Sequence, residues 1–395
     1  MKKSIQLSSL IIVLSTVFLL NACSQPTPPA QNKIYSKEAL GKQLFNDISL
    51  SKNGTQACAS CHNSQHAFID SRANASSLSP NAVPAVALGQ DNKSLGDINP
   101  PSVAYAAFVP QFHFDKEEQL FIGGLFLNGR SPNIEDQAKH PLLNEIEMQT
   151  SQQVVVKKVQ AKYGKALQAL YGDDIFSNTD KAFTAVADSI AQFEKTDEVS
   201  PFNSKFDKVL SGQLQFSELE QQGHDLFVDE DRANCVACHP VPKLTSSKTE
   251  SLFTDFSYDN LGIPINTAVR SLNGKGQDYI DNGLYENPQV DDPELKGAFR
   301  VSGLRNVAVT APYMHNGVFN DLETVVHFYN SRDVKDAINP ETQQPWKQGE
   351  VDANKNSDEL GDLELTDKEI RAIVAFMQTF TDERYEHLIP TTSYE

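Results

Sequence analysis

Cysteine is scarce in this sequence, and what little there is occurs in an unusual arrangement. Only five cysteines occur among 395 residues, at positions 23, 58, 61, 235 and 238. Four of them form two Cys-x-x-Cys pairs, and the fifth belongs to the N-terminal segment. No cysteine is left over for a disulfide, so the two pairs need another explanation.

Positive charge and long apolar runs are also in short supply. Acidic residues outnumber basic ones by 52 to 34, which gives a formal net charge of −18. Such a balance argues against a nucleic-acid partner and favours cationic ones. Beyond the N-terminal segment, no stretch reaches the roughly 18 apolar residues that a spanning helix requires. With 39% hydrophobic residues, the chain can still bury ordinary cores in two or three domains.

The N-terminal segment reads as a targeting signal. Two lysines precede an apolar run at 10–20, which is too short for a spanning helix. The sequence Leu-Asn-Ala-Cys then resembles a bacterial lipobox, so 1–22 is predicted to be a lipoprotein signal peptide and Cys23 the lipidated N-terminus. A Pro/Gln-rich tether follows at 23–34. We expect a periplasmic protein that contacts the membrane only through its lipid anchor, with Ser24 favouring the outer membrane; an uncleaved anchor and an ordinary secretory signal are the alternatives.

Both cysteine pairs belong to the pentapeptide Cys-x-x-Cys-His. Two thiols at this spacing can form thioethers to one edge of a haem, and the adjoining imidazole can bind the iron. The sequence therefore predicts two covalent haem c groups, one on Cys58, Cys61 and His62 and the other on Cys235, Cys238 and His239. A zinc site takes four ligands from paired motifs, which fits two pairs 177 residues apart poorly. A thioredoxin-like pair would not need the histidine.

The chain repeats more than the pentapeptide. EALGKQLF (38–45) precedes the first copy and EQQGHDLF (220–227) the second, each placing Gly and then Leu-Phe on a helix that enters a haem-binding loop. Ser217 with Glu220 forms a capping box for the second of these helices. Sequence spacing thus indicates the opening of a cytochrome c domain twice.

The remaining pattern is mainly helical. A closing helix is predicted at 366–380, with Thr366 and Glu369 as its capping box, and helical periodicity covers 150–171 and 179–197. Strand-like alternation is scarce. Long loops rich in Asn, Pro and Gly are expected at 71–102, 241–295 and 330–360. The predicted fold class is mostly α: two cytochrome c-type haem domains packed together with long loops, at 35–200 and 201–395.

Three further segments carry a family resemblance. NPPSVAYAAF (99–108), GGLFLNGRSPNIEDQAKHPLLNEIEM (123–148) and FRVSGLRNVAVTAPYMHNG (299–317) resemble the bacterial di-haem cytochrome c peroxidase and MauG family. The resemblance covers nearly all of 35–385. It implies a peroxidatic haem in the N-terminal domain, an electron-transfer haem in the C-terminal domain and a calcium ion between them, with a C-terminal tail that can pack back on the first domain.

One departure from the family concerns access to the N-terminal haem. In the peroxidases a loop histidine caps this haem until reduction opens it. The equivalent loop here, 86–102, contains no histidine, and Gln90 falls near that place. A neutral amide is a poor iron ligand, so this haem is expected to be open without reductive activation. His66 and His113 are the nearby alternatives.

The axial ligand of the second haem resembles that of MauG. The peroxidases place Met fourteen residues after the histidine that is His315 here, and this chain has Tyr329 at that distance. A phenolate oxygen stabilises ferric iron relative to a thioether and lowers the haem potential. Met314 is the rival ligand, and an aromatic core position on the helix expected at 322–330 is the other role for Tyr329.

The resemblance also supplies an acid and its neighbours. Peroxide cleavage needs a carboxylate to move a proton, and Glu147 matches the family acid, while Gln137 and Pro141 match other residues of the distal pocket. Glu145 would face the same side of an extended segment, so the choice of Glu147 rests on the resemblance alone.

Calcium ligands are implied in the same way. Asn99, with the backbone carbonyls of Thr310 and Pro312, matches the family's calcium site, and oxygen donors suit a hard cation. Asn-Pro and Thr-Ala-Pro segments are also common in ordinary turns.

A second departure lies between the haems. The family often has Trp at the position of Leu127, whereas the only Trp here is Trp346, in a loop expected to be polar. Leucine cannot be oxidised, so electrons would tunnel or use another aromatic residue such as Tyr105 or Phe126.

These features predict a di-haem enzyme that reduces hydrogen peroxide to water with electrons from a small c-type cytochrome or cupredoxin. A MauG-like enzyme that oxidises a residue on a partner protein is the first alternative; Tyr329 and the missing loop histidine favour it, and Leu127 counts against it. A non-enzymatic di-haem electron carrier is the second, and would leave Glu147 without a role.

Overall fold

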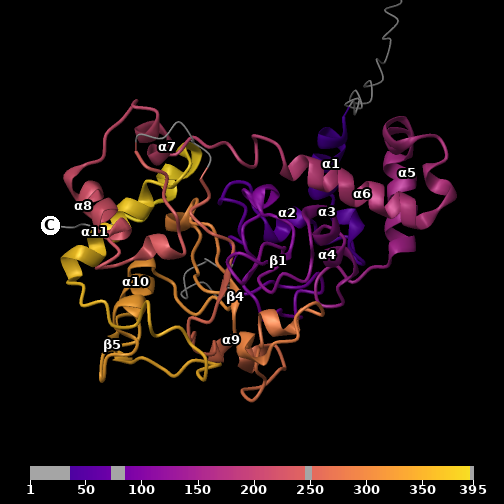
Figure 1. The fold of residues 1–395 in the computed structure, drawn as a ribbon. Helices are drawn as coiled ribbons and strands as arrows, with labels where there is room; N and C mark the ends of the chain where they lie inside the picture. Colours follow the sequence, from indigo (N-terminus) through magenta and orange to yellow (C-terminus); the bar gives the residue numbers. More distant parts are fainter. Residues whose placement is uncertain (1–35, 73–84, 245–250, 392–395) are drawn as a thin grey trace, which may run out of the picture. The chain divides into compact units, whose positions relative to one another are not determined.

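Two pairs of crossing helices organise the chain. In the computed structural model, which describes residues 36–72, 85–244 and 251–391, α1 (Lys37–Phe45) packs against α6 (Thr179–Glu194). Farther along the chain, α8 (Glu218–Val228) packs against α11 (Asp367–Gln378). Figure 1 shows the two pairs well apart, each beside its own half of the chain. The predicted signal peptide, Cys23 and the tether lie outside the described residues.

A glycine allows each pair of helices to approach closely. A Cβ atom on Gly41 of α1 would stand 1.8 Å from the carbonyl oxygen of Ser189 in α6. A Cβ atom on Gly223 of α8 would stand 1.9 Å from the carbonyl oxygen of Ala372 in α11. The repeated Gly is therefore the contact point of each crossing, and the Phe that follows it in each copy, Phe45 or Phe227, is buried in the adjoining core.

The predicted helix starts are present. Ser217 and Glu220 form the capping box of α8, and Thr366 and Glu369 form that of α11. On α11 the apolar face is buried as expected from its period. The described residues outside these four helices contain α2 (Cys58–Cys61), α3 (Ile134–Gln137), α4 (His140–Leu143), α5 (Gln152–Tyr171), α7 (Lys205–Leu210), α9 (Thr267–Leu272) and α10 (Leu322–Ser331).

Extended structure is limited to short antiparallel pairs in the described part of the chain. These are β1 (His113–Asp115) with β2 (Leu120–Ile122), β3 (Tyr258–Asp259) with β4 (Phe299–Arg300), and β5 (Ile338–Asn339) with β6 (Gln344–Pro345). Long loops connect the elements, so the mostly α fold class with long loops is confirmed. Within residues 36–72, 85–244 and 251–391, none of the helices has both the length and the apolarity needed to cross a bilayer.

Each half has its own hydrophobic core. Side chains of α1, α5 and α6 form the first, and side chains of α8, α10 and α11 form the second. Aromatic rings dominate the second core; Phe253, for example, stacks on Phe380 with centroids 3.8 Å apart. The loop expected to be polar around Trp346 contributes to this core, because the indole packs against Phe319 and Phe328 and donates to Ser331 Oγ at 3.0 Å.

The C-terminal tail returns to the first half of the chain. Tyr385 donates its hydroxyl to the carbonyl oxygen of Ser64 at 2.9 Å. Asp382 accepts a hydrogen bond from Tyr105 at 2.6 Å. The two halves are thus joined by buried polar contacts as well as by the chain itself.

We expect Gly41→Ala and Gly223→Ala each to destabilise the holoprotein by at least about 1–3 kcal/mol, because the new methyl group has to push two helix backbones apart. Denaturant unfolding followed by circular dichroism measures this. Gly164→Ala on α5 is the matched control, since its new Cβ would meet nothing closer than 3.8 Å and helix propensity then favours Ala by about 1 kcal/mol. Wild-type stability in Gly41→Ala would contradict the close crossing.

Candidate active site

Both pentapeptides fold as short helical turns that end at the histidine. Cys58 and Cys61 lie on α2, and Cys235 begins the 3₁₀ turn η4 (Cys235–Ala237). In each turn the histidine N–H donates to the carbonyl oxygen of the first cysteine at 2.9 Å. The same local geometry therefore presents two half-buried thiols and an imidazole at both places.

The two imidazoles are held in the same tautomer. His62 Nδ1 lies 3.1 Å from the carbonyl oxygen of Phe68, and His239 Nδ1 lies 2.8 Å from that of Phe253. A carbonyl oxygen only accepts, so Nδ1 carries the proton and Nε2 keeps its lone pair for a metal. Burial lowers the pKa of both histidines, which keeps them neutral and suited to ligation.

A cavity of about 420 Å³ adjoins the first pentapeptide and includes Cys61 and His62 in its wall. It also brings together three residues that the family resemblance singled out, Gln137 from α3, Pro141 from α4 and Glu147 from the turn that follows α4. Leu127, which stands where the family often has Trp, is buried in the same wall. The wall thus combines the predicted proximal histidine with the predicted acid.

Glu147 and Glu145 differ in their surroundings. Asn144 Nδ2 donates to Glu147 Oε1 at 2.6 Å, and Glu145 is exposed to solvent. Burial raises the pKa of Glu147, against the smaller opposing effects of Asn144 and the Arg130 guanidinium. A proton is therefore held more readily on this carboxyl than on a free glutamate. Sequence spacing did not show which of the two acids faces the cavity. In the structure the turn directs Glu147 toward the cavity and leaves Glu145 in solvent.

Gln90, which stands in place of the loop histidine, is held by hydrogen bonds inside the protein. It is buried, its Oε1 accepts from the Asn53 N–H at 3.2 Å, and its Nε2 donates to Gln149 Oε1 at 3.0 Å. His113 is exposed on β1, and His66 Nδ1 lies 3.2 Å from Asn63 Nδ2. None of the three is among the described residues that line the cavity.

Sequence reasoning did not single out several charged residues of the cavity wall, and two of them have a buried atom without a hydrogen-bond partner. Glu194, the last residue of α6, is buried, and its Oε2 has no hydrogen-bond partner. Burial, with a smaller effect of Glu135, raises its pKa to about 8. Arg300 is half-buried, and its Nε atom is buried without a hydrogen-bond partner. A charged residue on the buried stripe of α6 was a signal for Glu194, since Phe183, Ile190 and Glu194 share that face.

The donors in this cavity fit a haem c. Two thiols at the required spacing, a neutral imidazole with a free Nε2 and an enclosed space beside them meet the needs of covalent attachment and ligation. The open N–H of Arg300 suits a carboxylate, such as a haem propionate.

At the second pentapeptide, α10 brings Tyr329 near the thiols. Burial raises the pKa of Tyr329, and its electrostatic interactions with Cys238 and Cys235 add to the effect. Met314, the rival ligand, packs on the same core from a corner with a φ of 71°. The position of Tyr329 therefore agrees with its predicted role as the axial ligand, which stays a prediction.

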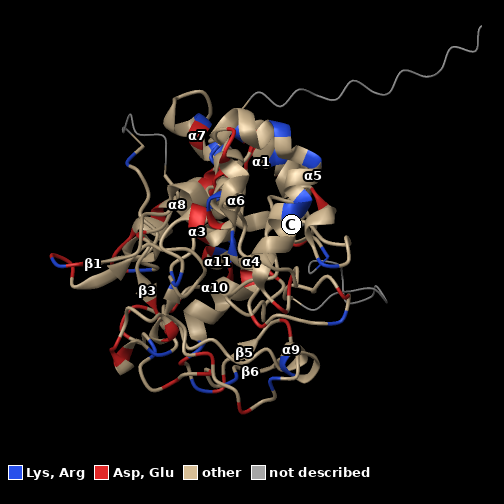
Figure 2. Ribbon diagram, turned by 90° about the vertical axis from the view of Figure 1, so that its right-hand side faces the viewer, with Lys and Arg blue, Asp and Glu red and all other residues tan. Residues whose placement is uncertain are grey.

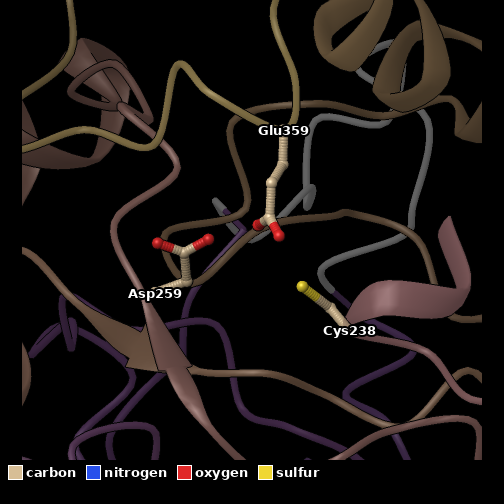
Figure 3. Close-up of side chains that lie close together, drawn as sticks. All are labelled: Cys238, Asp259 and Glu359. Carbon is tan, nitrogen blue, oxygen red and sulfur yellow. The ribbon is translucent and has the colours of Figure 1, made fainter. Parts of the chain in front are cut away.

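Two carboxylates converge on this second site. The sulfur of Cys238 and carboxylate oxygens of Asp259 and Glu359 all lie within 4.8 Å of one another (Figure 3). Asn356 Nδ2 donates to both acids, at 2.7 and 2.8 Å. If Cys238 forms the predicted thioether, its sulfur would belong to the haem, and Asp259 and Glu359 would lie beside that point of attachment.

The predicted calcium ligands lie partly together. Asn99 Nδ2 donates to the carbonyl oxygen of Pro312 at 2.7 Å, and the Asn99 N–H donates to that of His315 at 2.8 Å. Thr310 ends the 3₁₀ turn η7 (Val307–Val309), two residues before Pro312. Turning the Asn99 amide by 180° would direct its oxygen toward the same carbonyl group, as a cation requires.

The free energy of unfolding is expected to depend on pH through the buried carboxyl group of Glu194. Its carboxyl keeps a proton in the folded protein up to about pH 8, whereas an unfolded glutamate loses it near pH 4.5. Stability from this group is therefore full below pH 4.5 and falls by about 1.4 kcal/mol per pH unit as the pH rises toward 8. In Glu194→Gln, unfolding measured across this range should lack that loss; a wild-type slope in the variant would contradict the assignment, and exposed Glu145→Gln is the control.

Comparisons with known proteins show the family of the chain. Residues 35–215 match the family model described as di-haem cytochrome c peroxidase. MauG, the methylamine utilization protein of Paracoccus denitrificans, is 42% identical over 358 residues, which cover 89% of this chain and 90% of that protein. Cytochrome c551 peroxidase of Nitrosomonas europaea is 26% identical over 98% of this chain and 95% of its own length. The crystal structure of the diheme peroxidase BthA from Burkholderia thailandensis matches with a TM-score of 0.79 and 31% identity over 90% of this chain and 88% of that one.

The family accounts for the two haem c groups and for an oxidoreductase rather than a simple electron carrier. With two matching pentapeptides, a shared fold and 42% identity to MauG, the chain belongs to the di-haem cytochrome c peroxidase and MauG family.

Proposed function

We propose that this protein reduces hydrogen peroxide to water at its N-terminal haem, with electrons from a small c-type cytochrome or cupredoxin. The observation that carries the proposal is the position of Glu147, whose carboxyl shares one cavity wall with His62. Reduction of one peroxide to two waters takes two electrons and two protons, so a group that moves protons within this cavity is required. Cys58, Cys61 and His62 would hold a haem c, which would supply the iron that exchanges electrons with peroxide.

The protein's own part is to hold and move a proton. Burial brings the pKa of Glu147 closer to neutral pH, which favours both uptake and release of a proton. Asn144 engages Oε1 and so fixes the plane of the carboxyl group. Among the described residues no hydrogen bond reaches Oε2, which supports its role in exchanging the proton with peroxide. Gln137 and Pro141 complete this side of the cavity.

Access to this cavity needs no reductive step in our proposal. The loop at 86–102 carries Gln90 in place of a histidine, and both ends of its amide are occupied by Asn53 and Gln149. A side chain held in this way does not swing to an iron. The all-ferric protein is therefore expected to react with peroxide directly.

We further place the enzyme in the periplasm, held to the outer membrane by lipid on Cys23, with calcium at Asn99, Thr310 and Pro312. The net charge of −18 supports a cationic electron donor. Acidic residues occur on many parts of the chain, including the β1 hairpin and the loops beside β5 and β6 (Figure 2). Steering by such a surface weakens as salt rises.

Oxidation of a residue on a partner protein is the second candidate function. The 42% identity to MauG and the position of Tyr329 near Cys235 and Cys238 favour it. Leu127 counts against it, because an oxidisable side chain is missing there. The two functions differ in which reductant restores the peroxide-treated protein, a small redox protein in the first case and a residue of a protein substrate in the second.

Glu147→Gln should slow the reaction of the all-ferric protein with peroxide by about 10²–10⁴-fold, because the amide keeps the shape but cannot shuttle the proton. Stopped-flow absorbance of the haem bands measures the rate. Glu145→Gln, exposed and two residues away, should react like the wild type. A low-spin oxidised N-terminal haem that ignores peroxide until half-reduced would contradict the open site and point to His66 or His113.

Tyr329→Phe should leave the C-terminal haem with an open sixth position, seen as a change toward high spin by electron paramagnetic resonance. Tyr329→Met should raise the potential of that haem, since a thioether favours ferrous iron relative to a phenolate. Met314→Ala is the comparison variant. If it alters the spectrum while both Tyr329 variants leave it unchanged, Met314 is the ligand.

A further inference from the structure

Tyr105 occupies a buried place between the two halves of the chain. Its side chain is 4% exposed and belongs to the cavity wall that also contains His62 and Glu147. Its backbone N–H donates to Ser200 Oγ at 3.0 Å, and its ring meets that of Phe202 edge to face at 4.8 Å. Contacts from several elements thus hold the phenol in one orientation.

The hydroxyl group of Tyr105 is aimed at a buried acid. It donates to Asp382 Oδ1 at 2.6 Å and accepts from the Phe202 N–H at 3.1 Å. Asp382 is fully buried, and Asn306 Nδ2 donates to its other oxygen at 2.8 Å. Burial raises the pKa of both Tyr105 and Asp382, so the phenol keeps its proton at rest while the acid is readier than usual to take one.

Packed groups continue from Tyr105 to the second pentapeptide. The guanidinium of Arg305 lies 5.0 Å from the Tyr105 ring centroid and 5.4 Å from that of Phe253. The carbonyl oxygen of Phe253 accepts the hydrogen bond from His239 Nδ1 at 2.8 Å. Tyr105 therefore adjoins the cavity of the first site. Contacts through Arg305 and Phe253 also connect it to His239, the predicted proximal histidine of the second site.

Four residues along this connection have a left-handed backbone conformation. Tyr105, Phe202, Phe253 and Asn306 all have positive φ values, of 64°, 48°, 53° and 62°. Residues other than glycine adopt such angles at a cost, and they persist where the surrounding structure over-determines them. The conformation that costs energy is the one that brings the phenol, the acid and the ring of Phe253 together.

Other aromatic side chains near the cavity lack this arrangement. Phe126 carries no ionisable hydrogen and is covered by Arg130 at 3.5 Å. Tyr279, the other tyrosine of the cavity wall, has Lys275 as its side-chain hydrogen-bond partner, with Nζ 3.9 Å from the ring centroid. Tyr258, outside that wall, donates its hydroxyl to the carbonyl oxygen of Gly123 at 2.6 Å, and a carbonyl accepts a hydrogen bond without taking the proton. Tyr105 is thus the phenol of this wall whose hydrogen-bond partner is a carboxylate.

We propose that Tyr105 is a redox-active relay between the two haem sites, with Asp382 as its proton acceptor. When hydrogen peroxide has oxidised the haem pair, Tyr105 gives up one electron toward it. The phenol O–H bond breaks, an O–H bond forms on Asp382 Oδ1, and a neutral tyrosyl radical remains until the donor returns the electron and Asp382 returns the proton. The electron from Tyr105 replaces one of the two that the haem pair has given to peroxide. The relay rests on the proposed reaction with peroxide and gives it the electron route that Leu127 cannot supply.

The test is electron paramagnetic resonance of all-ferric holoprotein mixed with hydrogen peroxide and frozen, made with ring-deuterated tyrosine to identify a tyrosyl radical. We expect the radical in the wild type and its loss in Tyr105→Phe. Tyr258→Phe, which also removes a buried hydroxyl group, should keep it. Asp382→Asn should lower the radical yield at least several-fold, because an amide cannot accept the proton.

Optical spectra of the same samples separate the two ideas. A haem spectrum that changes with peroxide, accompanied by no tyrosyl radical or by one that survives in Tyr105→Phe, overturns the relay and leaves the proposed function standing. A wild-type haem spectrum that ignores peroxide overturns both. Haem content and circular dichroism show whether each variant is folded, and if Tyr105→Phe is not, a wild-type radical yield in Asp382→Asn overturns the relay.

Discussion

The close approach of two helix backbones at a single glycine is the constraint on which each half of this protein depends. At Gly41 and again at Gly223, even one methyl group would collide with the carbonyl oxygen of the partner helix. The crossing fixes the direction of α1 and α8, and the chain leaving each helix then reaches its Cys-x-x-Cys-His turn. Buried Phe45 and Phe227, just after the glycines, anchor each helix in its core. Each Cys-x-x-Cys-His turn therefore begins a short distance after the glycine of its crossing, 17 residues after Gly41 and 12 after Gly223.

Several ionisable side chains are buried in this protein, and most of their polar atoms are paired. An ionised group inside a protein costs free energy unless it is paired, and Arg305 is paired with Asp207 through two N–H groups at 2.8 Å. Asp382 receives two hydrogen bonds in the same region. Glu194 and Arg300 are different, because each has a buried polar atom without a partner in the cavity wall. A buried polar atom without a partner calls for an explanation, and a bound cofactor or a reaction at that place is one.

Loop segments form both the cavity and the contacts between the two halves of the chain. The segment after α4 turns Glu147 into the cavity and leaves Glu145 in solvent. The segment around Tyr105 closes the cavity and also meets the C-terminal tail. Proton transfer and electron transfer can therefore be supported by separate carboxylates, Glu147 at the first site and Asp382 beyond it, each with its own hydrogen-bond partner.

Several features of this protein follow from neighbouring residues alone. Pentapeptide spacing specified where the thiols and imidazoles stand, capping boxes such as Ser217 with Glu220 marked the helix starts, and apolar periodicity gave the buried face of α11. These features follow from local geometry, in which each turn of helix repeats the same spacing. Family resemblance added Gln137, Pro141 and Glu147, which the fold brings into one wall.

Other features depend on residues that lie far apart in the chain and meet only in the folded protein. Tyr105 and Asp382 are 277 positions apart, and no local pattern relates them. Trp346 joins the second core although its own neighbours in sequence are polar. Glu194 becomes unusual only because α6 buries it against the cavity, which raises its pKa. Burial and desolvation are sums over everything that packs around a group, so they exist only once the distant segments have met.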